Sequence, residues 1–204
     1  MFSKLIRGLL GFFGLIEKTL VFKKSDFNEF ARSLAPGSII CLHKRQHCDG
    51  LTDGIEAASN SAYSHVLNYL GQSSGFEGIL HEIIEEIAEG FKCQSLDKYN
   101  SDDYQLIAFI FPITPREFML LRASFAKWKD TPYDIQGIVH QAIPIIPDDP
   151  TKKYCSNVTT QCWMIENHIR DIVKKNVNPL DATPGDIFNG CYPNLECKIT
   201  RFNC

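Results

Sequence analysis

Short apolar runs bounded by proline or glycine predict most of the strands in this chain. Residues 38–42 follow an Ala-Pro-Gly turn and residues 64–70 follow a polar stretch, and both predict strands. The run 106–111 (LIAFIF) is apolar throughout, which is typical of a strand buried on both faces. Residues 79–87 fit an amphipathic helix or a strand, and the glycines on either side favour a strand. We expect a last short strand over 186–188.

Helices are predicted between these strands. A short helix is expected over 26–34, and the polar stretch 43–62 suggests a loop and one helix. The sequence Thr-Pro-Arg-Glu at 114–117 has the pattern of a capping box with proline at the first helical position, so a helix should start there and run to about Trp128. A further helix is expected over 154–175. The pattern predicts one α+β domain, without repeats or a clear linker.

The N-terminal segment differs from the rest of the chain. In residues 1–24, Lys4 and Arg7 precede an apolar run, 9–16, that is much shorter than the ~20 residues needed to span a bilayer. No small-x-small cleavage site follows this run. An amphipathic helix on a membrane and a helix packed on the protein's own core both remain open. We therefore divide the chain into this segment and a domain over 25–204.

Composition and charge exclude several classes of protein. The 204 residues are 44% hydrophobic and 22% charged, which excludes a disordered or collagen-like chain. The net charge of −3 gives no basic excess, so a nucleic-acid partner is not expected. The 8 cysteines form no CxxC pairs, which argues against a zinc ribbon. Reduced thiols are favoured, with one disulfide among the tail cysteines 191, 197 and 204 as the alternative.

Cys155 and His65 are the candidate catalytic residues. Cys155 falls at the expected first turn of the 154–175 helix, where the positive end of the helix dipole stabilises a thiolate. A cysteine nucleophile needs a base, normally histidine. Among six histidines, His65 stands out because it lies inside a predicted strand, which can aim its ring. Each residue alone also fits an ordinary structural role, so the pattern leaves catalysis open.

The order of several short motifs adds to this picture. The chain carries, in sequence, PGSII at 36–40, SAYSHV at 61–66, IIEEI at 83–87, TPYD at 131–134, YCS at 154–156 and TPGDI at 183–187. Together they resemble the YiiX-like, circularly permuted branch of the NlpC-type papain-fold hydrolases. The resemblance covers roughly residues 35–190. It implies a permuted papain-like core, with an antiparallel sheet or small barrel packed against helices.

The resemblance also implies roles for individual residues. Cys155 matches the family's nucleophile, His65 its base and Glu85 the third polar member. Glu82 and Glu86 compete with Glu85, which we prefer because alternation places it on the apolar face of the predicted strand. Two positions depart from the family pattern, Asn157 for glutamate and Leu67 for glycine. Residues expected to line the substrate site are Tyr133, Ser64 and Ser156.

The function expected from this resemblance is hydrolysis of an amide bond, in a peptide or amino-acid-linked substrate, through a thioacyl-enzyme. Such a site needs no metal and no cofactor. Two alternatives stay open: a lipid acyl hydrolase or acyltransferase that contacts a membrane through residues 1–22, and a catalytically silent binding module of the same fold. The expected partner is a small peptide-, amino-acid- or lipid-derived substrate. A cytoplasmic or membrane-associated location is favoured over export.

Overall fold

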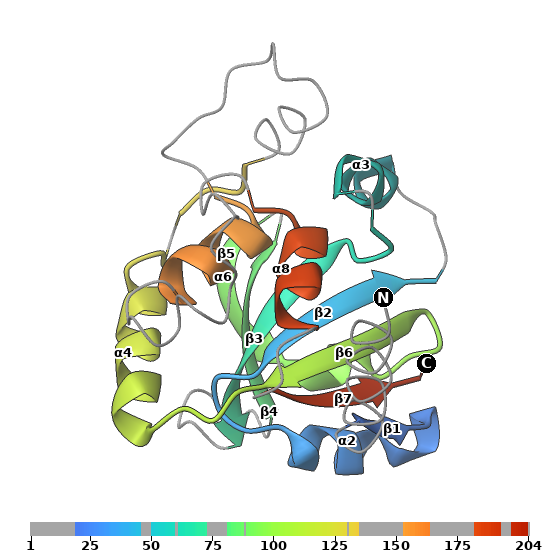
Figure 1. The fold of residues 1–204 in the computed structure, drawn as a ribbon. Coiled ribbons are helices and arrows are strands. Elements are labelled where there is room, and N and C mark those ends of the chain that lie inside the picture. The colour runs from blue at the N-terminus through green and yellow to red at the C-terminus, as the bar shows by residue number, and fades with distance from the viewer. Residues whose placement is uncertain are drawn as a thin grey trace, which may run out of the picture.

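A seven-stranded sheet forms the centre of the computed structural model, in the order β1-β7-β6-β2-β3-β4-β5 (Figure 1). Neighbouring strands are antiparallel except β1 and β7, which are parallel, so the sheet is mixed. The structure describes residues 19–45, 50–59, 61–72, 81–87, 89–129, 131–134, 153–163, 182–192 and 197–203. The strands are β1 Thr19–Phe22, β2 Ile39–Lys44, β3 His65–Gln72, β4 His81–Ile87, β5 Gly90–Ser95, β6 Tyr104–Ile110 and β7 Lys198–Phe202.

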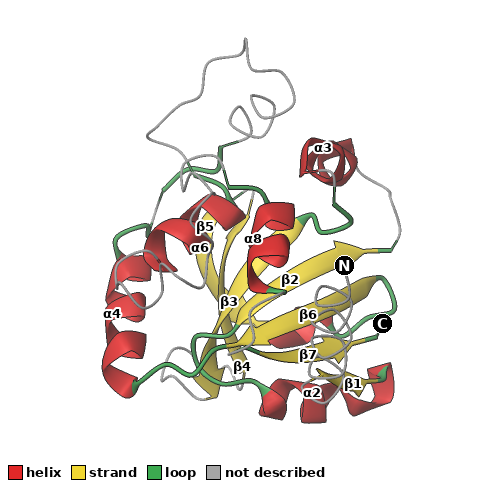
Figure 2. Ribbon diagram, viewed as in Figure 1, coloured by secondary structure: helices red, strands yellow, loops and turns green. Residues whose placement is uncertain are grey.

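Helices cover both faces of this sheet (Figure 2). One face packs against three helices, α4 Pro115–Ala126, α6 Cys155–Trp163 and α8 Pro184–Cys191. The other face packs against α2 Phe27–Ser33 and the short 3-10 helix η2 Leu96–Tyr99. The remaining elements are α3 Gly50–Ser59, which contacts α8, and the 3-10 turn η1 Lys24–Asp26. The central strands are therefore buried on both sides, as the apolar run at 106–111 predicted.

Most of the predicted elements are present. The α+β class is confirmed, and the strands expected over 38–42, 64–70 and 106–111 correspond to β2, β3 and β6. Residues 81–87 form a strand, so the glycine brackets indicated the correct element. In α4, the Thr114 side chain accepts from the Glu117 backbone, and the Glu117 carboxylate accepts from the Thr114 backbone. This is the predicted capping box, with proline at the first turn.

The strand predicted over 186–188 is wrong, because these residues lie in helix α8. The Thr183 side chain accepts from the Asp186 backbone N–H at 3.0 Å, and the Asp186 carboxylate accepts from the Thr183 N–H at 2.9 Å. Pro184 then occupies the first helical turn, so a second capping box starts a helix here. Of the helix predicted over 154–175, the structure describes α6 Cys155–Trp163, and residues 164–175 lie outside the described part of the chain.

The last residues of the expected N-terminal segment belong to the sheet. Thr19–Phe22 form the edge strand β1, in parallel register with β7, so a helix does not extend over these four residues. The ring of Phe22 lies 6.2 Å from that of Phe30 in α2. The expectation for residues 1–18 concerns residues outside those described. Among the described helices, none is long and apolar enough to cross a membrane.

Candidate functional site

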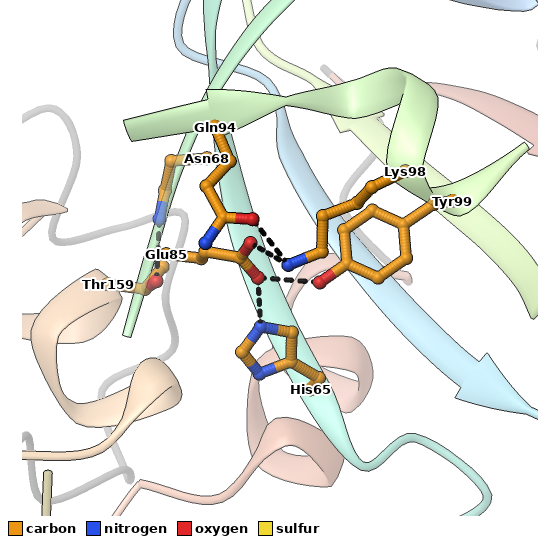
Figure 3. A network of polar contacts seen from close by, with 7 residues as sticks. All are labelled: His65, Asn68, Glu85, Gln94, Lys98, Tyr99 and Thr159. Carbon is orange, nitrogen blue, oxygen red and sulfur yellow. Dashed lines mark hydrogen bonds and ion pairs between the residues drawn. The ribbon is translucent and has the colours of Figure 1, made fainter. Parts of the chain in front are cut away.

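His65 and Glu85 meet at the start of β3 (Figure 3). His65 is the first residue of β3. Leu67, two residues further along, is paired with Glu85 of the antiparallel strand β4. Residues two apart on a strand share a face, so this register puts His65 and Glu85 on the same side of the sheet. The His65 Nε2 lies 2.6 Å from Glu85 Oε2. The structure thus brings together the predicted base and the predicted third polar residue.

Glu85 is held by three side chains. Besides the contact with His65, Glu85 Oε2 accepts a hydrogen bond from the Tyr99 hydroxyl at 2.6 Å, and Oε1 accepts one from Lys98 Nζ at 2.6 Å. Burial alone would raise the pKa of this carboxyl, but the contacts with His65, Lys98 and Tyr99 outweigh it and lower the pKa to about 2. Glu85 is therefore a carboxylate across the neutral range, although its side chain is completely buried.

Cys155 lies close to the His65 ring. It is the first residue of α6, and its sulfur lies within electrostatic range of the His65 ring, because its charge contributes to the raised pKa of His65. Because Glu85 occupies Nε2, Nδ1 is the ring nitrogen left for Cys155. The sulfur is covered, since Cys155 is 3% exposed. One imidazole thus links a thiol at a helix start to a buried carboxylate.

The charge state of His65 follows from these neighbours. Burial opposes a charged imidazole, but the interactions with Cys155 and then Glu85 outweigh it and raise the pKa of His65 to about 10. At neutral pH the ring is an imidazolium. Such a cation stabilises a neighbouring thiolate by direct Coulomb attraction, and the low polarity of a buried site strengthens that attraction.

A buried polar contact fixes α6 on the sheet beneath it. Asn68 of β3 donates from Nδ2 to Thr159 Oγ1 at 2.7 Å and accepts at Oδ1 from the Trp163 indole at 3.1 Å. All three side chains are at most 2% exposed. The bonds join the helix that carries Cys155 to the strand that carries His65, so they fix the distance between the two.

The competing glutamates lie on the opposite face of β4. Glu82 and Glu86 alternate with Glu85 along the strand, and Ile84 between them packs against the core that contains α6. Glu85 is therefore the carboxylate that meets His65. Glu86 is buried, and neither of its carboxyl oxygens has a hydrogen-bond partner among the described residues. Burial raises its pKa to about 8, against the opposing influence of His65.

The three residues expected to line a substrate site differ in how the structure places them relative to Cys155. The pKa of Tyr133 is raised by burial and then by the charge of Cys155, which places its hydroxyl within electrostatic range of the sulfur. Ser156 follows Cys155, is fully buried, and its hydroxyl has no partner within the described chain. Ser64 precedes His65 and is buried, and its backbone N–H donates to Leu42 O at 3.1 Å. Substrate contact by any of them stays a prediction.

Other cysteines and histidines take different roles. Cys41, Cys93, Cys162, Cys191 and Cys197 are free thiols, as is Cys155, while Cys48 and Cys204 lie outside the described ranges. His81 shares a 2.9 Å hydrogen bond with the Tyr69 hydroxyl, and His43 Nδ1 donates to the Ala62 carbonyl at 2.6 Å. Neither histidine is placed as a partner of Cys155.

Sequence reasoning missed Lys98, Tyr99 and Asn68. Lys98 and Tyr99 lie in η2, directly after β5, and the strand itself was not predicted because its polar residues give no clear alternation. Asn68 lies in a predicted strand, where an amide surrounded by apolar neighbours was the available signal of a buried polar contact.

Comparisons with known proteins support the fold. A scan against protein-family models finds no matching family, and a search of curated proteins finds no match. Among solved structures, the chain is similar to the crystal structure of metalloprotein yiiX from Escherichia coli O157:H7, DUF1105. The TM-score is 0.51 with 14% identity, and the match covers 82% of this chain and 96% of that chain. At this identity the similarity shows a YiiX-like fold and nothing about activity.

Proposed function

We propose that this protein is a cysteine hydrolase that cleaves an amide bond, with Cys155 as nucleophile, His65 as base and Glu85 as the residue that orients the base. The observation that carries the proposal is the position of His65, which is hydrogen-bonded to the buried Glu85 carboxylate through Nε2 and lies within electrostatic range of the Cys155 sulfur. A nucleophile, a base and an orienting group in this sequence of contacts form the arrangement that acyl transfer requires.

The chemistry follows from the charges. The Cys155 thiolate attacks the substrate carbonyl carbon, and its C–S bond forms while the carbonyl oxygen takes up negative charge. The His65 imidazolium then donates its proton to the leaving amine as the C–N bond breaks, leaving a thioacyl-enzyme. Neutral His65 next takes a proton from water, whose oxygen attacks the thioester, and as the C–S bond breaks the product leaves as a carboxylic acid and Cys155 returns to the thiolate beside the His65 imidazolium. Glu85 stabilises the imidazolium throughout and fixes its tautomer.

The start of α6 supplies the expected oxyanion site. Backbone N–H groups in the first turn of a helix have no partner within the helix, and they point along its positive end. The N–H of Cys155 is among these groups. Donors of this kind stabilise the tetrahedral intermediate because its oxygen carries more charge than the ground-state carbonyl.

The proposed fold assignment is the permuted NlpC-type papain-like core. In support of it, a helix that begins with cysteine packs on two adjacent antiparallel strands that carry histidine and glutamate. The sequence resemblance assigns those same three positions. The substrate proposed with it is a small peptide-, amino-acid- or lipid-derived molecule.

The fold neighbour is described as a metalloprotein, which raises the question of whether this chain holds a metal site. Over the ranges that the structure describes, no group of three or more His, Cys, Asp and Glu side chains is arranged to hold a metal ion. Both oxygens of Glu85 already accept hydrogen bonds. The described residues do not fit such a site, and the proposed mechanism assigns every step to protein side chains.

A silent binding module is the second candidate, because the sulfur of Cys155 is covered and a substrate must gain access to it. The test is the rate at which iodoacetamide labels Cys155 at neutral pH, read by peptide mass spectrometry. We expect Cys155 to react at least about tenfold faster than Cys162, whose pKa burial raises to about 12, and His65→Ala to abolish the difference. Equal rates at the two cysteines would contradict the proposal and favour the module.

A parallel experiment addresses the lipid alternative. It compares the full chain with a chain that lacks residues 1–18 and keeps β1 intact. Both are tested for binding to anionic liposomes. Both are also tested for acylation of Cys155 by peptide amides and by lipid esters. Acylation by amides without liposome binding supports the amide hydrolase. Acylation by lipid esters alone, with binding that depends on residues 1–18, assigns the acyl hydrolase or acyltransferase instead.

A further inference from the structure

We infer that Tyr99 and Lys98 are positioning residues, which keep His65 in its working orientation by fixing the Glu85 carboxylate. The positioning role rests on the proposed function for its meaning, and hydrogen-bond geometry, burial and charge around Glu85 support it. Neither side chain is placed in contact with Cys155 or a substrate, so both act through Glu85.

The two carboxylate oxygens of Glu85 accept hydrogen bonds from different donors. Oε2 accepts from both the His65 ring and the Tyr99 hydroxyl, each at 2.6 Å, while Oε1 accepts from Lys98 at 2.6 Å (Figure 3). A carboxylate held at both oxygens cannot rotate about its terminal bond without breaking a charge-assisted hydrogen bond. The lone pair that faces His65 Nε2 is therefore fixed in direction.

Further contacts hold the donors Tyr99 and Lys98 in place. Tyr99 is buried, and burial followed by the charge of Glu85 raises the pKa of its hydroxyl, which keeps it a donor. Lys98 also donates to Gln94 Oε1 at 2.8 Å, and its ammonium lies 4.8 Å from the centre of the Tyr99 ring. The turn that carries both begins at Ser95, whose hydroxyl accepts from the Asp97 N–H. Tyr99 is thus part of the core, whereas the Lys98 side chain reaches Glu85 from the surface and is 36% exposed.

Two positive charges balance the negative charge of the buried Glu85 carboxylate. Glu85 lies between two cations, the His65 imidazolium and Lys98, so the buried carboxylate does not depend on His65 alone for its charge. When His65 gives up its proton during acyl transfer, Lys98 and Tyr99 still stabilise Glu85 as an anion. Glu85 therefore stays unprotonated, and the proton that the attacking water loses goes to His65.

The test follows the Nε2–H proton of His65 by NMR and needs no substrate. The variants are Tyr99→Phe and Lys98→Met. Tyr69→Phe is the matched control for the tyrosine, since it removes a buried hydroxyl bonded to His81. Lys92→Met is the control for the lysine, because Lys92 is exposed and lies opposite Glu85 on β5 in the strand register.

We expect the ring proton to exchange with solvent at least about tenfold faster in Tyr99→Phe and Lys98→Met than in their controls, with Lys98→Arg restoring slow exchange. Iodoacetamide labelling of Cys155 should slow in the same two variants. Exchange rates equal to those of the controls would overturn the inference. Faster exchange together with wild-type Cys155 that labels no faster than Cys162 would support the positioning role while the hydrolase proposal fails.

Discussion

Two adjacent carboxyl groups on β4 show how neighbours decide charge. Glu85 meets three hydrogen-bond donors, and its pKa is lowered to about 2. Glu86 points to the other face, where burial raises its pKa to about 8. At neutral pH the first is an anion and the second is mostly a neutral acid, so the sequence Glu-Glu carries two different functions.

Replacing each glutamate by glutamine separates these functions through the pH dependence of stability. The pKa of Glu86 is raised on folding, so its contribution to stability is full below about pH 4.5 and is lost as the pH rises towards about 8. Glu86→Gln should therefore gain stability relative to wild type over that window, by roughly 1–3 kcal/mol at its upper end.

Glu85→Gln should behave in the opposite way. The pKa of Glu85 is depressed on folding, so its stabilisation is present above about pH 4.5 and is lost as the pH falls through about 2. This variant should lose stability at neutral pH, by roughly 1.5–3 kcal/mol. Urea unfolding of each variant and of wild type at about pH 5 and about pH 8 measures the difference in the free energy of unfolding. A Glu86→Gln variant whose gain over wild type is smaller at about pH 8 than at about pH 5 would contradict the assignment.

At the scale of elements, the site depends on how α6 is attached to β3. Asn68 bonds both Thr159 and Trp163 of the helix, and these contacts lie in the core beside the site. By contrast, the capping box at Thr183 stabilises α8 without touching His65 or Cys155. The two contacts therefore contribute to the same folded state but differ in their expected effect on chemistry.

This difference gives a prediction that separates an effect on the chemistry of Cys155 from an effect on stability alone. Asn68→Leu should lower the free energy of unfolding by roughly 1–3 kcal/mol and slow the labelling of Cys155, because α6 loses its fixed position. Thr183→Ala should cost about 1 kcal/mol and leave labelling unchanged. Denaturant unfolding and peptide-resolved labelling measure the two quantities. Equal labelling in both variants would show that α6 is positioned by other contacts.

At the scale of the whole molecule, the sheet brings together residues that are distant in sequence. Cys155 arrives on a helix from one face, while Tyr99 and Lys98 arrive from the opposite face through η2. His65 and Glu85 lie at the end of adjacent strands, where both groups can reach them. The site is accordingly a product of the complete fold and not of one local motif.

Much of this fold was predictable from sequence because its strands are strongly apolar. The strands β2, β3 and β6 follow from apolar runs, and the start of α4 follows from its capping box. The edge strands β1 and β5 have mixed composition, and their pairing partners supply the structure that their own residues do not. The strand predicted at 186–188 is wrong because the capping box between Thr183 and Asp186 starts a helix there.

The site was predictable only in part. The positions of Cys155 and His65 followed from a helix start, a strand and the order of motifs. The choice of Glu85 over its neighbours followed from strand alternation. The hydrogen bonds from Tyr99 and Lys98 could not be predicted, because they depend on the path of the chain after β5 and on contacts between residues on different elements.

The ionisation of Cys155 itself is the most direct measurement of the central claim. Thiolate absorbance in the ultraviolet is recorded at neutral pH for wild type, Cys155→Ser and His65→Ala, with Cys162→Ser as a reference. If the imidazolium stabilises the sulfur anion, wild type shows one thiolate that disappears in both Cys155→Ser and His65→Ala and persists in Cys162→Ser. Identical absorbance in wild type and Cys155→Ser would mean that the sulfur is a neutral thiol, and the proposed hydrolase would be wrong.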